Sequence, residues 1–246
     1  MHLAHLWPAT LGAALAFLWP ARRAAEPFPF GVGERLVYDG VFGKLRVGSA
    51  ELRLDGIDTV RGREAFHAVF TVRGGLPLFR VDDTHESWFD VGTMTSYRFH
   101  QRINEVHYHR ERTFEILPDS GVYVENETKR RPTVAEPLDE VSFLYFLRTQ
   151  PLELGRSYEL ARYFRPDRNP VRFLVERRER VTVPAGTFDA LVLRPVIKTT
   201  GIFSEGGRAE VWVSDDDRRL VVQLKSQLTF GSINLYLRSY EPGQGH

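Results

Sequence analysis

The chain has 246 residues, of which 42% are hydrophobic and 12% aromatic, so it can bury a sizeable core and is not expected to be disordered. Its 33 Lys and Arg residues nearly balance its 32 Asp and Glu residues, which removes the electrostatic reason to expect a nucleic-acid partner. Cysteine is absent, which excludes a disulfide framework, a thiolate nucleophile and a cysteine-based metal site.

Residues 1–25 are predicted to be a secretory signal peptide. This stretch contains no acidic residue, and its apolar run from Ala9 to Trp19 has the length of a signal-peptide hydrophobic region but is short for a membrane span. An N-terminal anchor that is never cleaved is the competing interpretation, because His2 and His5 stand where signal peptides usually carry Lys or Arg. Both interpretations predict an exported protein of the periplasm or cell envelope. Apart from such an anchor, the protein is expected to be at most peripheral to the membrane.

A tether over residues 26–33 is expected to lead into a single β-rich domain at 34–241, followed by a tail at 242–246. Most of this domain consists of short segments of alternating apolar and polar residues separated by turn residues, which predicts antiparallel strands. The expected strands are 34–41, 45–54, 66–72, 78–90, 94–106, 108–117, 122–129, 157–164, 171–183, 189–198, 208–214, 220–228 and 232–240, with polar turns at 55–62 and 118–121.

The alternation is clearest at Phe66, Ala68, Phe70 and Val72, which predicts a half-buried strand. In the strand at 45–54 the apolar positions change from one face to the other part-way along. A β-bulge at Gly48 is expected to accommodate this change, because a bulge adds one residue to a strand.

Residues 139–149 are predicted to form the one convincing helix of the mature chain. Asp139 can serve as the N-cap, and Glu140 follows in the first turn, where a carboxylate opposes the positive end of the helix dipole. Apolar residues lie on most sides of this helix, which predicts that it is largely covered. The expected fold is therefore all-β, with a large curved antiparallel sheet or an open or closed barrel, one central α-helix packed on it, and an N-terminal signal helix.

Five stretches in this order and spacing resemble a family of exported bacterial proteins catalogued as domain of unknown function 3108. They cover the first two strands, the helix and two later strands, and the resemblance extends over roughly 31–240. The stretches are Gly33 to Tyr38, Val47 to Ala50, Asp139 to Arg148, Val181 to Ala190 and Val211 to Asp216. The resemblance implies a signal-bearing envelope protein of mostly antiparallel strands. It carries over no activity and no catalytic residue, and the likeness in outline to proteins that handle lipid or lipoprotein is an analogy of fold.

The helix is also the predicted ligand-binding element. Phe143, Phe146 and Leu147 are expected to line an apolar ligand tail, while Tyr145 and Arg148 present polar groups to its head. The structural alternative is that Arg148 forms an ion pair that fixes the helix to the sheet, since a covered arginine needs a carboxylate partner.

Histidines form the weak candidate for a metal site. His107 and His109 share one face of a strand, and His100 can reach them from a neighbouring strand, with His85 in the same region. The alternative is a set of exposed polar residues on an edge hairpin. No metal or cofactor is expected.

Three functions follow from this sequence. The leading prediction is a non-enzymatic envelope protein that binds a hydrophobic or amphipathic, lipid-like or acyl-bearing ligand in the concave face of a curved sheet. The second is a structural or assembly protein that docks another envelope protein through a sheet edge or an aromatic patch. The third is a hydrolase or metal-dependent enzyme that uses the histidine region.

Overall fold

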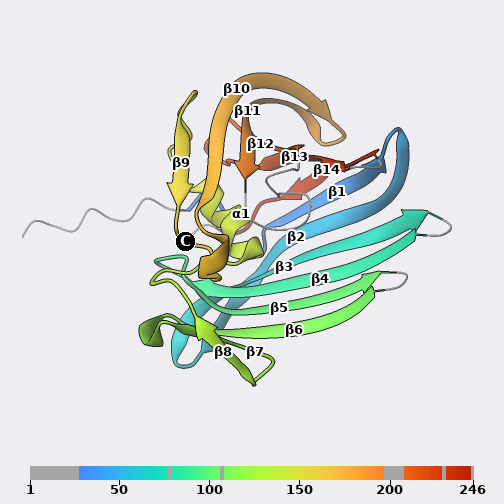
Figure 1. The fold of residues 1–246 in the computed structure, drawn as a ribbon. Coiled ribbons are helices and arrows are strands. Elements are labelled where there is room, and N and C mark those ends of the chain that lie inside the picture. Colours follow the sequence, from blue (N-terminus) through green and yellow to red (C-terminus); the bar gives the residue numbers. More distant parts are fainter. Residues whose placement is uncertain (1–27, 77–78, 106–107, 197–207, 229–230, 245–246) are drawn as a thin grey trace, which may run out of the picture.

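The computed structural model describes residues 28–76, 79–105, 108–196, 208–228 and 231–244. These residues form one antiparallel sheet of 14 strands, one α-helix and two 3-10 helices (Figure 1). The strand order is β8-β7-β6-β5-β4-β3-β2-β1-β14-β13-β12-β11-β10-β9, so β1 and β14, the first and last strands in sequence, are neighbours in the middle. The sheet curves but does not close, because β8 and β9 are its two edges. The predicted all-β class is confirmed, in its open form.

The strands of one half of the sheet come before the helix in sequence, and those of the other half follow it. The bounds are β1 (Arg35–Phe42), β2 (Leu45–Val60), β3 (Arg63–Leu76), β4 (Phe79–Asp90), β5 (Ser96–Glu105), β6 (Tyr108–Leu117), η1 (Pro118–Ser120), β7 (Val122–Glu125), β8 (Lys129–Pro132), α1 (Glu140–Arg148), β9 (Ser157–Leu160), η2 (Pro166–Arg168), β10 (Val171–Val183), β11 (Gly186–Val196), β12 (Arg208–Ser214), β13 (Val221–Leu228) and β14 (Gly231–Glu241).

Several expected boundaries are wrong by a few residues, such as the end of the strand expected at 157–164, which stops at Leu160. Two other differences change the course of the chain. The residues expected as a polar turn at 55–62 mostly continue β2, which bulges between Leu54 and Gly56 and ends at Val60. The single strand expected at 122–129 is two strands, β7 and β8, because Asn126 and Glu127 take left-handed backbone conformations that turn the chain between them.

A row of three paired glycines lies where β1, β2 and β3 cross the middle of the sheet. Gly40 pairs with Gly48, and Gly48 pairs with Gly74. A Cβ on Gly48 would collide with the carbonyl oxygen of Arg73 and lie 2.8 Å from the Cα of Gly74. The backbones of β2 and β3 therefore approach more closely here than side chains allow, in a conformation that glycine permits. A register shift next to Gly40 leaves Val47 without a partner on β1, so the bulge predicted at Gly48 lies one residue away.

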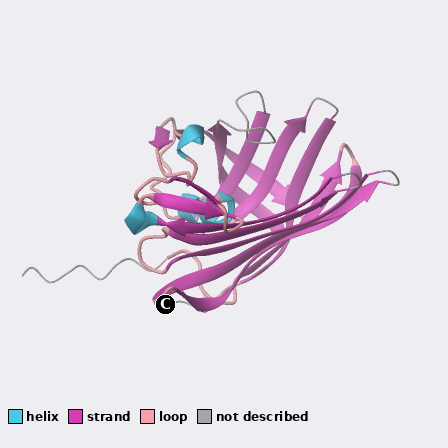
Figure 2. Ribbon diagram, turned by 60° about the horizontal axis from the view of Figure 1, so that its bottom comes forward, coloured by secondary structure: helices cyan, strands magenta, loops and turns pink. Residues whose placement is uncertain are grey.

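The helix α1 lies on the inner side of the curved sheet, between its two halves (Figures 1 and 2). On one side its residues join a buried cluster with Phe66, Phe89 and Phe99 of β3, β4 and β5. On the other side Leu147 packs in a cluster with residues of β10 to β13, including Phe173. The strand ends that connect β3 to β4 and β5 to β6 lie at the opposite end of the sheet from α1, on the right of Figure 1. The helix therefore fills one end of the concave face.

The predicted tether, residues 26–33, is part of the packed structure from residue 28 onward. Phe28 stacks on Phe30, and Phe30 is buried against Phe66 and Tyr145. The predicted signal peptide lies outside the described residues. No helix among the residues that the structure describes is both long and apolar enough to span a membrane.

Candidate functional site

The N-terminus of α1 is fastened to the sheet by a buried hydrogen-bond network. The side chain of Asp139 accepts hydrogen bonds from the backbone N–H groups of Val141 and Ser142 at 2.8 and 2.9 Å, and the Ser142 hydroxyl accepts from the Asp139 N–H at 2.9 Å. This reciprocal capping box confirms the predicted N-cap. Ser87 of β4 donates to Asp139 at 2.6 Å, and Ser96 of β5 lies 2.8 Å from the Ser142 hydroxyl, so two strands position the start of the helix.

This network also changes the titration of its carboxyl group. Complete burial raises the pKa of Asp139 to about 6, against the hydrogen bonds from Ser87, Ser142 and Ser96, which favour the charged form.

The C-terminus of α1 is fastened by a buried ion pair. Arg148 donates to both carboxylate oxygens of Glu34, at 2.5 and 2.8 Å, and both side chains are 0% exposed. Its remaining donors reach the backbone carbonyls of Pro29, Arg218 and Arg219. Burial lowers the pKa of Arg148, but the bonds and charge of Glu34 outweigh it, so the pKa is raised and the guanidinium stays charged. This is the ion pair that the structural interpretation of Arg148 expects.

The other predicted ligand-binding residues of α1 are mostly enclosed. Tyr145 is completely buried between the rings of Phe30 and Phe89, while Phe146 is 9% and Leu147 is 2% exposed. Only Phe143 of the five predicted residues is half-buried, and Leu144 beside it is as well. Two parts of the sheet cover the helix from opposite sides, so most of its apolar residues contact the core.

The structure instead brings together a polar row on the concave face, which we define as His85, Gln101 and Arg112. His85 of β4 pairs with Gln101 of β5, and Gln101 pairs with Arg112 of β6, so the three side chains share one face. That face is the one turned to α1, because Ser87, two residues from His85, contacts Asp139. Along β4, the polar row lies two residues further from the helix than Ser87 does.

The members of the polar row bind one another. A guanidinium NH2 of Arg112 donates to the Gln101 side-chain oxygen, and the Gln101 amide nitrogen lies 3.4 Å from Nδ1 of His85. The His85 ring stacks on Phe99, and the Arg112 guanidinium lies 5.3 Å from the ring centre of Phe114. Gln101, which is buried, therefore holds the orientation of both of its neighbours.

The protonation of the polar row follows from its burial. Burial lowers the pKa of His85, and the charge of Arg112 lowers it further, against Glu140 and Asp83, so His85 is neutral at pH 7. Burial, followed by the charge of Arg110, also lowers the pKa of Arg112. Arginine nevertheless remains charged in proteins, so the row presents one partly desolvated cation.

Half-buried apolar side chains adjoin the polar row on the same face. We call them the apolar strip, and they are Phe70 and Val72 of β3, Val81 of β4 and Ile103 of β5. Phe70 pairs directly with His85, and Ile103 is two residues from Gln101 on the same strand. The concave face beyond α1 thus carries partly exposed apolar surface next to a fixed cation.

Sequence reasoning missed the polar row, although a signal was present. In β5 the inward positions read Phe99, Gln101 and Ile103, and in β6 Arg112 precedes inward Phe114. A polar residue at an apolar position of the alternation marks an inward-facing polar group, but only the register shows that the two residues are neighbours.

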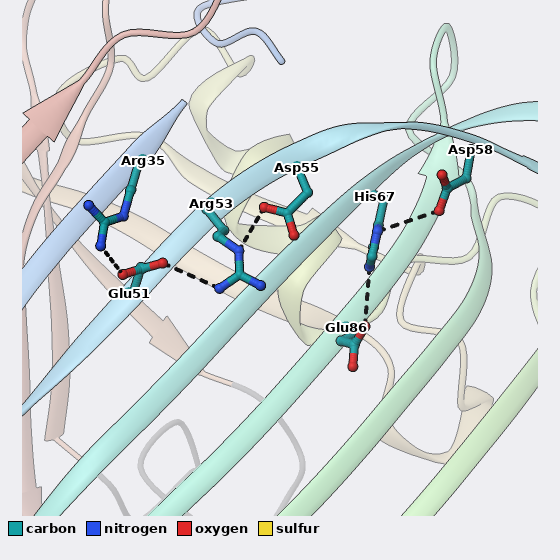
Figure 3. Close-up of polar contacts among 7 residues, drawn as sticks. All are labelled: Arg35, Glu51, Arg53, Asp55, Asp58, His67 and Glu86. Atoms are coloured by element: carbon teal, nitrogen blue, oxygen red, sulfur yellow. Dashed lines mark hydrogen bonds and ion pairs between the residues drawn. The ribbon is translucent and has the colours of Figure 1, made fainter. Parts of the chain in front are cut away.

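The convex face of the sheet is a network of charged residues open to solvent. Figure 3 shows two parts of it. Arg35 and His67 contact carboxylates on neighbouring strands, and Arg53 contacts two carboxylates of its own strand, β2. The residues drawn are Arg35, Glu51, Arg53, Asp55, Asp58, His67 and Glu86. Exposed ion pairs of this kind contribute little to stability, and we assign this face to solvation.

The structure separates the histidines of the candidate metal site. His85 lies on the concave face, whereas His100, which contacts Glu86 and Glu111, lies on the convex face. His109 pairs with Asn104, four residues along β5 from His100, which is roughly 13 Å for a strand. His107 lies outside the described residues. Within the described ranges no three His, Asp or Glu side chains form a group that could hold a metal ion.

The sequence matches a family model over most of its length. Residues 37–238 match the family described as protein of unknown function (DUF3108). Among curated proteins, none has a sequence that matches this chain.

Three solved structures align with most of this chain at low sequence identity. A beta-barrel-like protein of domain of unknown function DUF1849 from Brucella abortus aligns with a TM-score of 0.56 and 10% identity, covering 87% of this chain and 99% of that one. A candidate lipoprotein from Parabacteroides distasonis aligns over 87% and 99% of the two chains with a TM-score of 0.38 and 13% identity. A candidate exported protein with a YmcC-like fold from Bacteroides fragilis aligns over 87% and 98% with a TM-score of 0.32 and 11% identity. The first similarity is one of fold alone.

Proposed function

This chain belongs to the DUF3108 family of proteins of unknown function. The family name gives no role, so we propose one from the structure of this chain. We propose that it is an exported, non-enzymatic envelope protein that binds an amphipathic, lipid-like ligand. The ligand lies on the concave face of the sheet, beyond α1. The observation that carries this proposal is the contact between the apolar strip and the polar row on that face.

The chemistry of the two surfaces supports a ligand with an apolar and a polar part. The apolar strip leaves Phe70, Val72, Val81 and Ile103 half-buried on a concave surface, where an acyl chain removes them from water. Each buried methylene of such a chain contributes roughly 0.8 kcal/mol. The polar row next to the strip offers a few oriented polar groups, which is the usual composition of a small-molecule site.

The helix has a different role in this proposal from the one that the sequence predicts. Because Arg148 and Tyr145 are enclosed and tied to the core, α1 closes one end of the concave face. Only Phe143 and Leu144 are half-buried and available to touch a ligand. We therefore propose that the ligand site is on the sheet beside the helix, and not on the helix itself as the sequence predicts.

Export is supported by the N-terminal sequence, whose apolar run has the features of a secretory signal. Mass spectrometry of the protein isolated from the envelope fraction of its source cells tests this directly. A mature mass that lacks about the first 25 residues is expected for a cleaved signal peptide.

Ligand binding is tested with native mass spectrometry of the same preparation and with a fluorescent fatty acid titrated into delipidated full chain. Replacing Ile103 by Gln is expected to weaken binding about tenfold, since one buried aliphatic side chain contributes roughly 1.5 kcal/mol or more. The matched control is Leu154→Gln, which changes an aliphatic residue that is 62% exposed in the segment between α1 and β9. Delipidated protein that takes up no lipid, or equal affinity for wild type and Ile103→Gln, contradicts the proposal.

A further inference from the structure

Arg112 has hydrogen-bonding capacity that its surroundings do not use. Its side chain is 16% exposed, and one NH2 group donates to Gln101. The nearest carboxylate among the described residues is that of Glu125, 4.0 Å from NH1, at the limit of an ion pair. Its Nε is buried without a hydrogen-bond partner among the described residues. A partly desolvated guanidinium with unused donors is the arrangement that binds an oxyanion.

The positive charge of Arg112 is only partly balanced by the negative charges around it. Arg110, on the same face of β6, also approaches Glu125, at 3.8 Å, so two arginines share one carboxylate. By cross-strand pairing, Lys129 lies opposite Glu125 and Arg131 opposite Tyr123, on the same face. The pKa of Arg112 is lowered mainly by burial and next by the charge of Arg110, and the second cause agrees with this surplus of positive charge.

Two further carboxylates act on this region from other elements. Glu140 of α1 favours the charged forms of His85 and Arg112, but its carboxylate accepts a hydrogen bond from the Tyr163 hydroxyl at 2.5 Å. Asp83 of β4 accepts from the Asn104 backbone N–H at 2.9 Å. Both carboxylates are thus engaged elsewhere, and neither is within ion-pair distance of Arg112 in the described structure.

We propose that Arg112, oriented by Gln101 and assisted by Arg110, binds the anionic head group of the ligand, a carboxylate or phosphate carried on an acyl chain. This inference rests on the proposed function and specifies its ligand. Gln101 fixes the guanidinium in advance, so less freedom is lost when the anion binds. The apolar strip begins two residues along β5 from Gln101, where the chain attached to the head group continues over Ile103 and its diagonal neighbour Val81 on β4.

The experiment measures the affinity of delipidated full chain for palmitate, for palmitoyl lysophosphatidate and for hexadecanol, which has the same chain length and no charge. Wild type is expected to prefer the two anions to hexadecanol. Arg112→Gln is expected to weaken the binding of both anions about tenfold to a hundredfold, the usual contribution of a charge-assisted hydrogen bond. The hexadecanol affinity of the Arg112→Gln variant is expected to stay within about twofold of the wild-type affinity, because uncharged hexadecanol forms no ion pair with the guanidinium.

Two further variants separate anion binding from changes in folding or total charge. Arg110→Gln removes an exposed side chain, so it keeps the fold and is expected to weaken anion binding a few-fold. Arg102→Gln changes the net charge equally on the opposite face of β5 and is expected to change no affinity.

Other outcomes overturn the inference in distinguishable ways. Equal affinities of wild type for palmitate and hexadecanol, or an anion affinity that neither Arg112→Gln nor Arg110→Gln changes, refute anion recognition and leave the proposed function intact. If none of the three lipids binds, both proposals fail. If inorganic phosphate alone binds as tightly as palmitate, the site is one for a free anion, and the assignment to a lipid head group is wrong.

Discussion

Arg148 and Glu34 lie 114 residues apart in sequence and form two hydrogen bonds, of 2.5 and 2.8 Å, in a site that excludes solvent. The bond connects the last turn of α1 to the residue before β1, in the middle of the sheet. A buried arginine that loses its carboxylate leaves an uncompensated charge, and the same holds for the carboxylate. This pair therefore holds the helix against the sheet.

Replacing Arg148 by Met is expected to lower the free energy of unfolding by about 3–5 kcal/mol, because Glu34 is left charged and buried. Urea denaturation followed by circular dichroism measures this. The double variant with Glu34→Gln is expected to lose less than the sum of the single losses, since both changes remove one interaction. The surface control Arg156→Met breaks an exposed pair with Glu153 and is expected to change stability by less than about 1 kcal/mol. Additive losses at Arg148 and Glu34 contradict the role of the pair.

The close approach of the paired glycines Gly40, Gly48 and Gly74 leads us to expect that Gly48 tolerates no side chain. A methyl group at this position meets backbone atoms of Arg73 and Gly74, so β2 and β3 have to separate. Gly48→Ala is expected to destabilise the protein by about 1–3 kcal/mol, the cost of overpacking. Gly56→Ala in the same strand is the control, because a Cβ there meets nothing within 4 Å. Thermal melting distinguishes the two variants, and equal melting temperatures rule out the proposed close approach.

Because of Asp139, the free energy of unfolding is expected to fall as pH rises. Its pKa of about 6 in the folded chain exceeds the ordinary 3.8, so the folded state binds more protons than the unfolded state between these values. The contribution of Asp139 is therefore complete below about pH 4 and declines until about pH 6, by an amount on the order of 3 kcal/mol.

The variant Asp139→Asn tests this, because Asn also caps helices but does not titrate. The difference in unfolding free energy between the variant and wild type, measured from pH 4 to 7, is expected to shift in favour of the variant as pH rises. Asp139→Ala is the control for capping and is expected to lose about 1 kcal/mol from the missing cap. A difference between Asn variant and wild type that is constant with pH disproves the raised pKa.

Two buried tyrosines differ in whether their hydroxyls are satisfied. The Tyr38 hydroxyl donates to the carbonyl oxygen of Val221 at 2.9 Å, whereas the Tyr145 hydroxyl has no partner among the described residues. Tyr38→Phe is expected to cost about 1–3 kcal/mol, because it leaves a buried carbonyl unpaired. Tyr145→Phe is expected to be neutral or stabilising by up to about 1 kcal/mol. A larger loss for Tyr145→Phe than for Tyr38→Phe in chemical denaturation contradicts this assignment.

Local features of the sequence were sufficient to predict the helix and most strands. Asp139 caps α1 through contacts within three residues, so sequence spacing alone locates the helix start. The alternation at Phe66, Ala68 and Phe70 likewise depends only on the two-residue repeat of a strand. The errors fell where local composition misled: Asp55 and Asp58 resemble a turn, but on the convex face polar residues are compatible with a strand.

The position of the candidate site depended on contacts that no local pattern contains. From the sequence, Arg148 could either pair with a carboxylate of the sheet or face a ligand head group. The contact with Glu34, more than a hundred residues earlier, shows that it forms the ion pair. His85, Gln101 and Arg112 come from three strands, and a slip of one residue in either pairing would place them on opposite faces. The sequence by itself determined the elements and their polarity, because these depend on neighbours along the chain. Only the tertiary structure decided which side chains meet on the concave face, because strand register and sheet curvature arise from pairing between distant segments.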